Sequence, residues 1–494
     1  MSQNLHKLIR SLDKFEKSYF KKFAHKSNSV KTSIYYGLFD AIAKQKKYDE
    51  SKLIKLFKDH FSEKQFSAAK NYLNNLILNC FCDYNSKKKI LSKIHNEIEK
   101  VEFLSSKKLY NQALTLLEKT LKKTLEYELF PYAMQLLYLK ETIIKRMDCI
   151  KTVIAYNKMG FKKEFEIIEQ WKNFREYSVM MNTFFAVEFN QSLTKATDES
   201  VKLDEMINSP FYQEESNGLS LLAKTTRFHI LSYGANIIGA SEDAYKAKRQ
   251  NVELFQQNSN FCKMYPMRYI SGVSNLAVAE IFRHNKKNTL QCIQYLEEIK
   301  LQSLDEEIYR TNIILSVWLL HYSVNQISFT VLEHIEELSL KFMSFVDYIA
   351  PNNRTELIFL LAYNYFLAKD YQRTIKWTEY FEQNGDKETS LEFQVGIKLI
   401  HLIANFEMGY QFYVEYGGAS TYRFIRNRGQ IYQTELALIL FLQKIMNLPK
   451  GEAKKKYFQK FKIKIKKIQG DRDSCVYGLF DLLGWVEEKI CSFT

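Results

Sequence analysis

The residues best suited to contact an anionic ligand form a basic aromatic stretch, residues 422–428 (YRFIRNR). Arginine binds phosphate through paired N–H donors, and aromatic rings stack on nucleobases. Tyr422 and Ile425, however, have the spacing of one helix face, which is typical of a core, and arginines also occur at the negative end of a helix dipole. Both interpretations stay open. The candidate contacts to RNA or phosphate in this stretch are Arg423, Arg426 and Arg428.

A second group of candidate contacts lies in residues 450–467, which hold 9 Lys and 1 Glu and therefore have a net charge of 9 − 1 = +8. Residues 460–468 (KFKIKIKKI) alternate as a strand would, but their apolar side chains also have helical spacing, and flanking helical patterns favour a helix. Such a helix can pack against the final helix or lie on an anionic membrane, although its apolar face is narrow. The candidate contacts are Lys454, Lys455, Lys456, Lys462 and Lys466.

The sequence contains no pattern that is typical of catalysis, nucleotide binding or metal binding. None of its 9 His residues pairs in an H-E-x-x-H or H-x-H spacing, and phosphate-loop, dinucleotide and nucleophile-elbow motifs are missing. Cys80 and Cys82 lie in an apolar run, which is better explained by packed thiols than by a ligand pair. We therefore expect a protein that is not an enzyme and has no cofactor and no metal.

The composition predicts an all-α fold. Only 5 Pro and 16 Gly occur in 494 residues, far fewer than a sheet-rich fold with many tight turns requires. Hydrophobic residues make up 46% of the chain, which is enough for a large core. Seven scattered Cys, no apolar signal-peptide core and no apolar run of about 18 residues indicate a cytoplasmic protein without a membrane span.

The elements that must position the candidate residues are best represented by residues 357–381 (LIFLLAYNYFLAKDYQRTIKWTEYF). Their apolar spacing predicts two amphipathic helices, with a break at residues 368–370. Pro351 and the two Asn after it predict a turn before the first helix, with Thr355 as its cap. Two such helices cannot bury their apolar surface alone, so neighbouring pairs are expected to stack on both sides.

This hairpin resembles a tetratricopeptide repeat. The residues at the family's Leu, small and Tyr positions are Leu361, Ala362, Tyr365, Tyr371 and Thr374. Lys369 stands where the family has its turn Gly, and the Trp and the closing Pro of the family are missing. Weaker likenesses occur at residues 109–121 and at Met408-Gly409-Tyr410. The resemblance implies helical hairpins stacked into a curved superhelix with a concave groove; an ordinary hairpin in an irregular all-α protein is the alternative.

The order of the whole chain also resembles a group of uncharacterised bacterial helical-repeat proteins. The residues that carry this likeness are 15–24 (FEKSYFKKFA), 35–42 (YYGLFDAI) and 484–490 (GWVEEKI). It implies no activity. The sequence predicts three segments: a basic N-terminal helical domain (1–89), degenerate tetratricopeptide-like repeats (90–447), and a C-terminal basic helix with a capping helix (448–494).

Charge is concentrated at the two ends of the chain. Residues 1–100 have a net charge of 21 − 10 = +11, residues 450–467 of +8, and the remainder sums to 15 − 11 − 8 = −4. The leading hypothesis is a protein-interaction scaffold that binds a peptide or protein segment in the repeat groove. The alternative is an RNA- or ribonucleoprotein-binding protein that uses the basic ends.

A third, weaker hypothesis concerns the first segment. Residues 50–57 predict a short helix, and a capping box of Ser62 and Gln65 starts a longer one, as in a helix-turn-helix. The second helix offers Lys64 and Lys70 to DNA. The chain would then be a peptide-sensing transcription regulator; a plain helical domain is the simpler interpretation.

Overall fold

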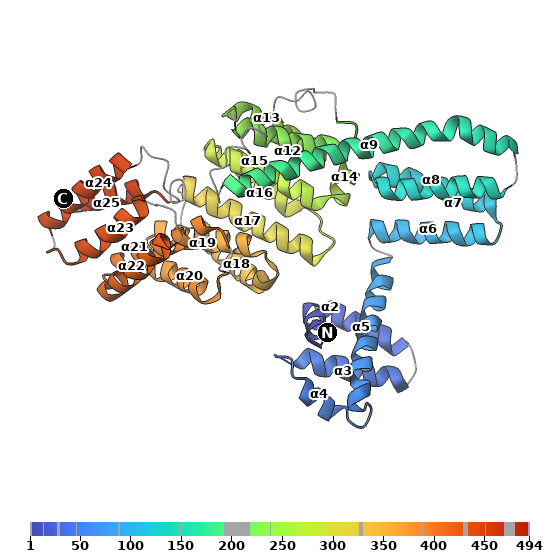
Figure 1. Ribbon diagram of the computed structural model, residues 1–494, viewed down its shortest axis with the longest axis horizontal. Coiled ribbons are helices and arrows are strands. Elements are labelled where there is room, and N and C mark those ends of the chain that lie inside the picture. Colours follow the sequence, from blue (N-terminus) through green and yellow to red (C-terminus); the bar gives the residue numbers. More distant parts are fainter. Residues whose placement is uncertain are drawn as a thin grey trace. The chain divides into compact units, whose positions relative to one another are not determined.

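The chain is α-helical throughout the part that the structure describes (Figure 1). The computed structural model describes residues 2–12, 14–26, 30–45, 47–86, 89–147, 150–191, 218–237, 239–325, 330–386, 389–427, 433–449, 451–468 and 480–492. These residues form 23 α-helices, one short 3-10 helix and no strand. The all-α class predicted from the sparse Gly and Pro is therefore confirmed.

Contacts divide the chain into two compact units, Met1–Ile167 (unit 1) and Ile168–Thr494 (unit 2). The helices of unit 1 are α1 (Ser2–Ser11), α2 (Lys14–Lys26), α3 (Val30–Lys44), α4 (Glu50–Leu56), α5 (Glu63–Ser86), α6 (Ile90–Ser106), α7 (Tyr110–Glu126) and α8 (Phe130–Arg146). Helix α9 (Ile150–Gln191) has 42 residues and continues from unit 1 into unit 2.

The helices of unit 2 after α9 are α12 (Leu221–Ile237), α13 (Ser241–Gln257), α14 (Ser259–Met264), α15 (Pro266–Phe282), α16 (Lys286–Glu298), α17 (Leu304–Asn325), α18 (Thr330–Phe345), η2 (Val346–Tyr348), α19 (Pro351–Leu367), α20 (Tyr371–Asn384), α21 (Leu391–Glu407), α22 (Gln411–Arg426), α23 (Gln433–Met446), α24 (Glu452–Ile468) and α25 (Leu482–Ser492). Helix α24 confirms the helical interpretation of the Lys-rich segment over the strand interpretation. Helix α19 begins at Pro351, so Thr355 is not its cap; the Thr355 hydroxyl instead donates to the Pro351 carbonyl inside the first turn.

The N-terminal part of unit 1 has its own apolar core, to which α1 to α5 contribute. Ile9, Phe20, Phe39 and Leu73 are fully buried in it. The predicted capping box begins α5, because the Ser62 hydroxyl accepts from the Gln65 backbone and the Gln65 side chain accepts from the Ser62 backbone. After α5, helices α6, α7 and α8 pack in sequence order.

Unit 2 contains a row of helices, α15, α17, α19, α21 and α23, in which each helix packs against the next. Each is followed by a helix that also packs against it, namely α16, α18, α20, α22 and α24 (Figure 1). Helices of the row are enclosed: α19 buries every residue from Leu357 to Phe366. The alternate helices bury a single stripe, which in α22 consists of Val414, Gly418, Thr421 and Ile425.

Six helix pairs are joined by the same turn, in which one residue has positive φ. These residues are Lys108, Glu128, Gly239, His284, Lys369 and Gly409. At each turn, the backbone N–H of the residue after the positive-φ residue donates to the carbonyl five residues earlier. Examples are Asp370 to the Tyr365 carbonyl (2.9 Å) and Tyr410 to the Asn405 carbonyl (2.9 Å). This is the Schellman arrangement, in which the residue after the turn already caps the following helix. Lys369, predicted to replace a turn Gly, lies at φ 61°.

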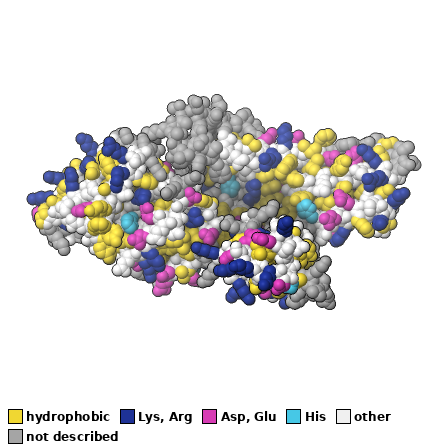
Figure 2. Space-filling view, turned by 60° about the horizontal axis from the view of Figure 1, so that its bottom comes forward, with side chains coloured by type: hydrophobic (Ala, Val, Ile, Leu, Met, Phe, Trp, Pro, Cys, Tyr) yellow, Lys and Arg dark blue, Asp and Glu magenta, His cyan; other side chains and the backbone are white. Residues whose placement is uncertain are grey.

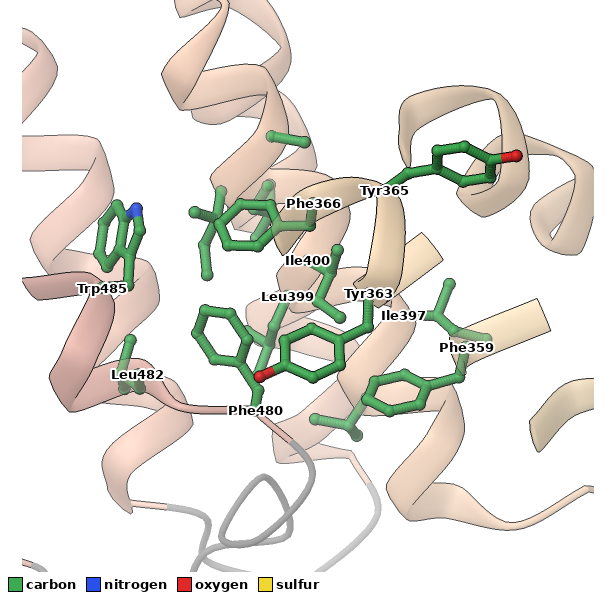
Figure 3. Close-up of a cluster of buried hydrophobic side chains, with 14 of the residues drawn as sticks. Phe359, Tyr363, Tyr365, Phe366, Ile397, Leu399, Ile400, Phe480, Leu482 and Trp485 are labelled. Atoms are coloured by element: carbon green, nitrogen blue, oxygen red, sulfur yellow. The ribbon is translucent and has the colours of Figure 1, made fainter. Parts of the chain in front are cut away.

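The C-terminal segment docks on the middle of the helix row (Figure 3). Phe480 packs edge-on against Tyr363 and Phe366 of α19, with ring centroids 5.7 and 5.5 Å apart. Leu482 and Trp485 of α25 belong to the same continuous apolar core, which extends from α17 to α25. Phe480 and α25 therefore cover apolar side chains of α19 and its neighbours in the row.

Candidate functional surfaces

A groove of about 740 Å³ lies at one edge of the helix row in unit 2. Helix α18, the turn between α19 and α20, and the end of α21 line it. Its polar side chains are mainly charged, and they include Glu333, Glu336, Lys369, Asp370 and Arg373. Such a volume accommodates a few side chains of a bound segment.

Arg373 is held at the centre of this groove by two carboxylates. Its guanidinium lies 3.4 Å from Glu336 and 3.6 Å from Asp370, and it covers the Tyr365 ring at 5.4 Å. Asp370 also accepts from the Arg373 backbone N–H (3.0 Å), which caps α20. Glu333 is exposed and makes no ion pair with the residues that the structure describes. The groove therefore has an acidic side chain left to attract a cation.

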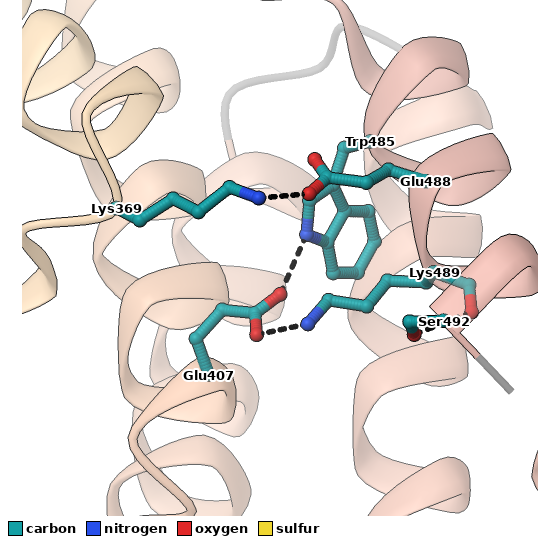
Figure 4. A network of polar contacts seen from close by, with 6 residues as sticks. All are labelled: Lys369, Glu407, Trp485, Glu488, Lys489 and Ser492. Atoms are coloured by element: carbon teal, nitrogen blue, oxygen red, sulfur yellow. Dashed lines mark hydrogen bonds and ion pairs between the residues drawn. The ribbon is translucent and has the colours of Figure 1, made fainter.

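One wall of the groove is fixed by contacts to α25 (Figure 4). Lys369 pairs with Glu488, while Glu407 receives the Trp485 indole N–H at 2.7 Å and the Lys489 ammonium. The Glu407 side chain is only 6% exposed. These bonds join α19, α21 and α25, so the edge of the groove is held in position by the C-terminal helix.

The structure separates the side chains of the predicted basic aromatic stretch into two environments. Ile425 is buried and Tyr422 packs against the core, so this part of the stretch belongs to the interior. Arg423 and Arg426 are exposed on the last turns of α22, and Arg423 donates to a carbonyl of its own helix. Arg428 lies outside the described residues.

Aromatic side chains that the sequence did not mark as candidate contacts are exposed on α22 and at its N-cap residue. These side chains are Tyr410, Phe412, Tyr413 and Tyr416, between 45% and 65% exposed. The Phe412 and Tyr416 rings have centroids 4.3 Å apart. The buried stripe of α22, rich in small residues, faces the other way, and this pattern was the sequence signal for an exposed aromatic face. We call these four residues, with Arg423 and Arg426, the aromatic–arginine face.

The predicted lysines of α24 also differ in their surroundings. Lys462 pairs with Glu487 at 2.8 Å, which lowers the pKa of that carboxyl through a hydrogen bond and charge attraction. Lys454 and Lys455 are half-buried, whereas Lys456 and Lys466 are exposed. Lys460, Lys464 and Lys467, which were not predicted as contacts, are exposed too. Figure 2 shows Lys and Arg gathered at the end of unit 2 that carries α22 to α25.

The lysines proposed for DNA reading are only partly accessible. Lys70 is buried in unit 1, where its ammonium pairs with Glu50 of α4 at 2.6 Å. Lys64 is exposed on the first turn of α5. The Lys70 ammonium thus fastens α5 to α4 instead of pointing outward, and it leaves α5 with little charge to offer a DNA groove.

Two titratable groups in the interior of unit 2, His229 and Cys262, are poorly suited to proton transfer or nucleophilic attack near pH 7. His229 lies between the amides of Asn251 (3.0 Å) and Asn275 (3.3 Å), and burial, aided by Arg268, lowers its pKa to about 4. Cys262 lines a separate pocket of about 270 Å³, and burial raises the pKa of its thiol to about 11. Near pH 7 the imidazole is therefore neutral and the thiol protonated.

Comparisons with protein-family models, curated proteins and solved structures found no match to this chain. In the described part of the chain, no group of three or more His, Cys, Asp or Glu side chains is arranged to hold a metal ion. Not one of the described helices combines the length and apolar character needed to cross a bilayer.

Proposed function

We propose that this chain is a non-enzymatic cytoplasmic scaffold built from tetratricopeptide-like helical repeats, which binds a segment of a protein partner in a groove of unit 2. The observation that carries the proposal is the row of helices in unit 2, together with the turn that three of its helix pairs share, at His284, Lys369 and Gly409. A stack of such units grows in one direction and presents extended surfaces, which is how repeat proteins bind peptides.

The buried positions of the best hairpin support the repeat interpretation. Leu361, Ala362 and Thr374, at the family's packing positions, are fully buried, and Tyr365 is nearly so. The turns Lys369 and Gly409 are 40 residues apart, and Gly239 and His284 are 45 apart. These intervals exceed the 34 residues of a tetratricopeptide repeat. We therefore propose repeats with longer helices than that family has.

The groove at the edge of the row is the proposed binding site. Arg373 is already neutralised by two carboxylates, and Lys369 is engaged with Glu488. Glu333 therefore supplies the charge that a ligand would meet, and Ala368, Tyr371 and Met408 supply apolar lining. This chemistry suits an extended peptide with a Lys or Arg side chain.

Charge reversal at the groove tests the proposal. The full-length wild-type chain and its Glu333→Lys variant are each incubated with an array of peptides that differ only in charge. In a second experiment, the partners that the two proteins capture from the protein's own cells are compared. Glu337→Lys is the matched control, because Glu337 is an exposed residue of the same helix outside the groove. We expect Lys- and Arg-containing peptides to bind the wild type and the control, and to bind the Glu333 variant about fivefold or more weakly.

A captured partner that resists nuclease and high salt and is lost only with Glu333→Lys would agree with this function. Equal binding by all three proteins would contradict the groove as the site. A preference for acidic peptides would contradict the proposed ligand.

A further inference from the structure

The aromatic–arginine face shares no residue with the groove lining. We propose that this face binds single-stranded RNA, with the bases stacked on the rings and the phosphates held by Arg423 and Arg426. This inference does not depend on the function proposed for the groove.

The aromatic half of the face has the form of a stacking platform. Phe412 and Tyr416 are one turn apart on α22, and both are more than 60% exposed. Tyr413 lies beside Phe412, with ring centroids 5.9 Å apart. The Tyr410 ring centroid is 6.1 Å from that of Tyr413. Exposed rings at adjacent positions cost solvation free energy unless a ligand covers them. Single-stranded nucleic acids supply flat partners of every sequence, because each base has a π-face.

The charged half follows along the same helix. Arg423 is eleven residues after Phe412, which places it roughly 16 Å farther along the helix axis. Arg423 and Arg426 make no ion pair with any described residue. The only carboxylate on α22 is Glu415, which is half-buried and accepts from Gln411 (2.9 Å). A chain with bases at the rings thus meets two available guanidinium groups beyond them.

Helix α24 adds positive charge to this end of unit 2. It contains eight Lys and one Glu, and its exposed lysines include Lys456, Lys460, Lys464 and Lys467. Such charge attracts a polyanion over about a Debye length. It strengthens binding at low salt but does not discriminate between nucleotide sequences. Exposed Ile463 (70%) lies among these lysines and would cover little of a ligand by itself.

Two features favour RNA over the other anionic partners. The hydroxyls of Tyr410, Tyr413 and Tyr416 form no hydrogen bond with the described residues, so they are available to the ribose 2′-OH that DNA lacks. Stacking requires unpaired bases, which a duplex does not offer. An acidic protein segment would satisfy the arginines, but it gives three adjacent rings no flat surfaces to stack on.

Fluorescence anisotropy of the full-length chain with a labelled RNA of about twelve nucleotides tests this inference. Single-stranded DNA of the same sequence and the RNA duplex serve as comparison ligands. The variants are Phe412→Ala, Tyr416→Ala and Arg426→Ala, all at exposed positions. The matched control is Phe282→Ala, because Phe282 and Phe412 are both 63% exposed. We expect each ring variant to weaken RNA binding about fivefold or more, and the control to leave it unchanged.

Arg426→Ala should lower the dependence of log affinity on log salt by about 0.7. Absence of RNA binding at low salt, or equal affinity of the Phe412, Tyr416 and Phe282 variants, would overturn the proposal. Binding of DNA as tight as RNA would overturn the assignment to RNA, and a preference for the duplex would overturn stacking. Glu333→Lys should leave RNA binding unchanged, which keeps this result distinct from that of the groove.

Discussion

Replacing Lys108 by glycine should stabilise the protein, although it removes a whole side chain. Lys108 joins α6 to α7 and has φ 62°, in the left-handed region. Its side chain is exposed and forms no ion pair with the described residues. An L-amino acid in this conformation suffers close contact between its Cβ and the backbone, and glycine does not.

The expected gain is the difference between two opposing terms. The left-handed conformation costs a non-glycine residue about 1–2 kcal/mol. Glycine also lowers the free energy of unfolding by about 0.5–1 kcal/mol, because it increases the conformational entropy of the unfolded chain. The net stabilisation of unit 1 should therefore be about 0.5–1 kcal/mol for Lys108→Gly.

The preceding residue provides a matched control. Lys107 has φ −86°, which any residue adopts, and it lies 5.6 Å from the Phe103 ring. Lys107→Gly should therefore destabilise the same helix pair by about 0.5–1 kcal/mol. Two identical residues in consecutive positions thus respond with opposite sign, and the difference between the variants should be about 1–2 kcal/mol.

Hydrogen–deuterium exchange of peptides from α6 and α7 measures this difference within unit 1. A global unfolding curve would be less suitable, because it combines the unfolding of both units. One kcal/mol corresponds to about a fivefold change in protection. Protection should rise in Lys108→Gly and fall in Lys107→Gly. If both variants lose protection equally, the turn does not have the left-handed conformation, and the argument from φ fails.

Three further predictions concern unit 2 and are measured by chemical denaturation and peptide-resolved exchange. Trp485→Phe keeps a six-membered aromatic ring but removes the indole N–H bound to buried Glu407, and it should destabilise α25 by about 1–3 kcal/mol. Gly396→Ala places a Cβ 2.8 Å from the Phe359 ring and should cost about 1–3 kcal/mol. The pKa of His229 is about 4 when folded, so the unfolded chain takes up more protons as pH falls from about 6.5. Stability should then fall by up to about 3 kcal/mol toward pH 4, and His229→Gln should reduce that loss.

The sequence predicted the helices of the best hairpin but not how they are enclosed. The spacing predicted one buried face, whereas α19 is buried on all sides from Leu357 to Phe366. The residues predicted for that face were Leu357, Leu360, Leu361 and Asn364, widened by Phe359, Ala362 and Phe366. The flanking residues of α19, including Tyr363, are apolar too, and this is the pattern of an enclosed helix. Enclosure depends on α17, α20, α21 and the segment at Phe480, whose packing against α19 no local spacing predicts.

Recurring turns were the feature hardest to predict. Gly409 and Gly239 have the residue that the left-handed region favours, but Lys108, Glu128, His284 and Lys369 occupy the same conformation without it. A glycine-based pattern therefore finds only two of these six turns. The tertiary contacts of the two helices stabilise the turn at the others, and Lys369 adds an ion pair to Glu488. The same turn geometry thus occurs with Lys, Glu, His or Gly at its positive-φ position.

For the binding surfaces, the sequence predicted charge better than position. Arg423 and Arg426 are exposed, as a contact to a ligand requires, but Lys462 is paired with Glu487. The aromatic side of α22 was missed because the stripe of Val414, Gly418, Thr421 and Ile425 indicates the buried face, but not whether another helix covers the opposite face. That depends on α22 being an alternate helix, which uses one face against α21 and α23. Aromatic residues on the opposite face have no helix of the row to cover them, so they are available to a ligand.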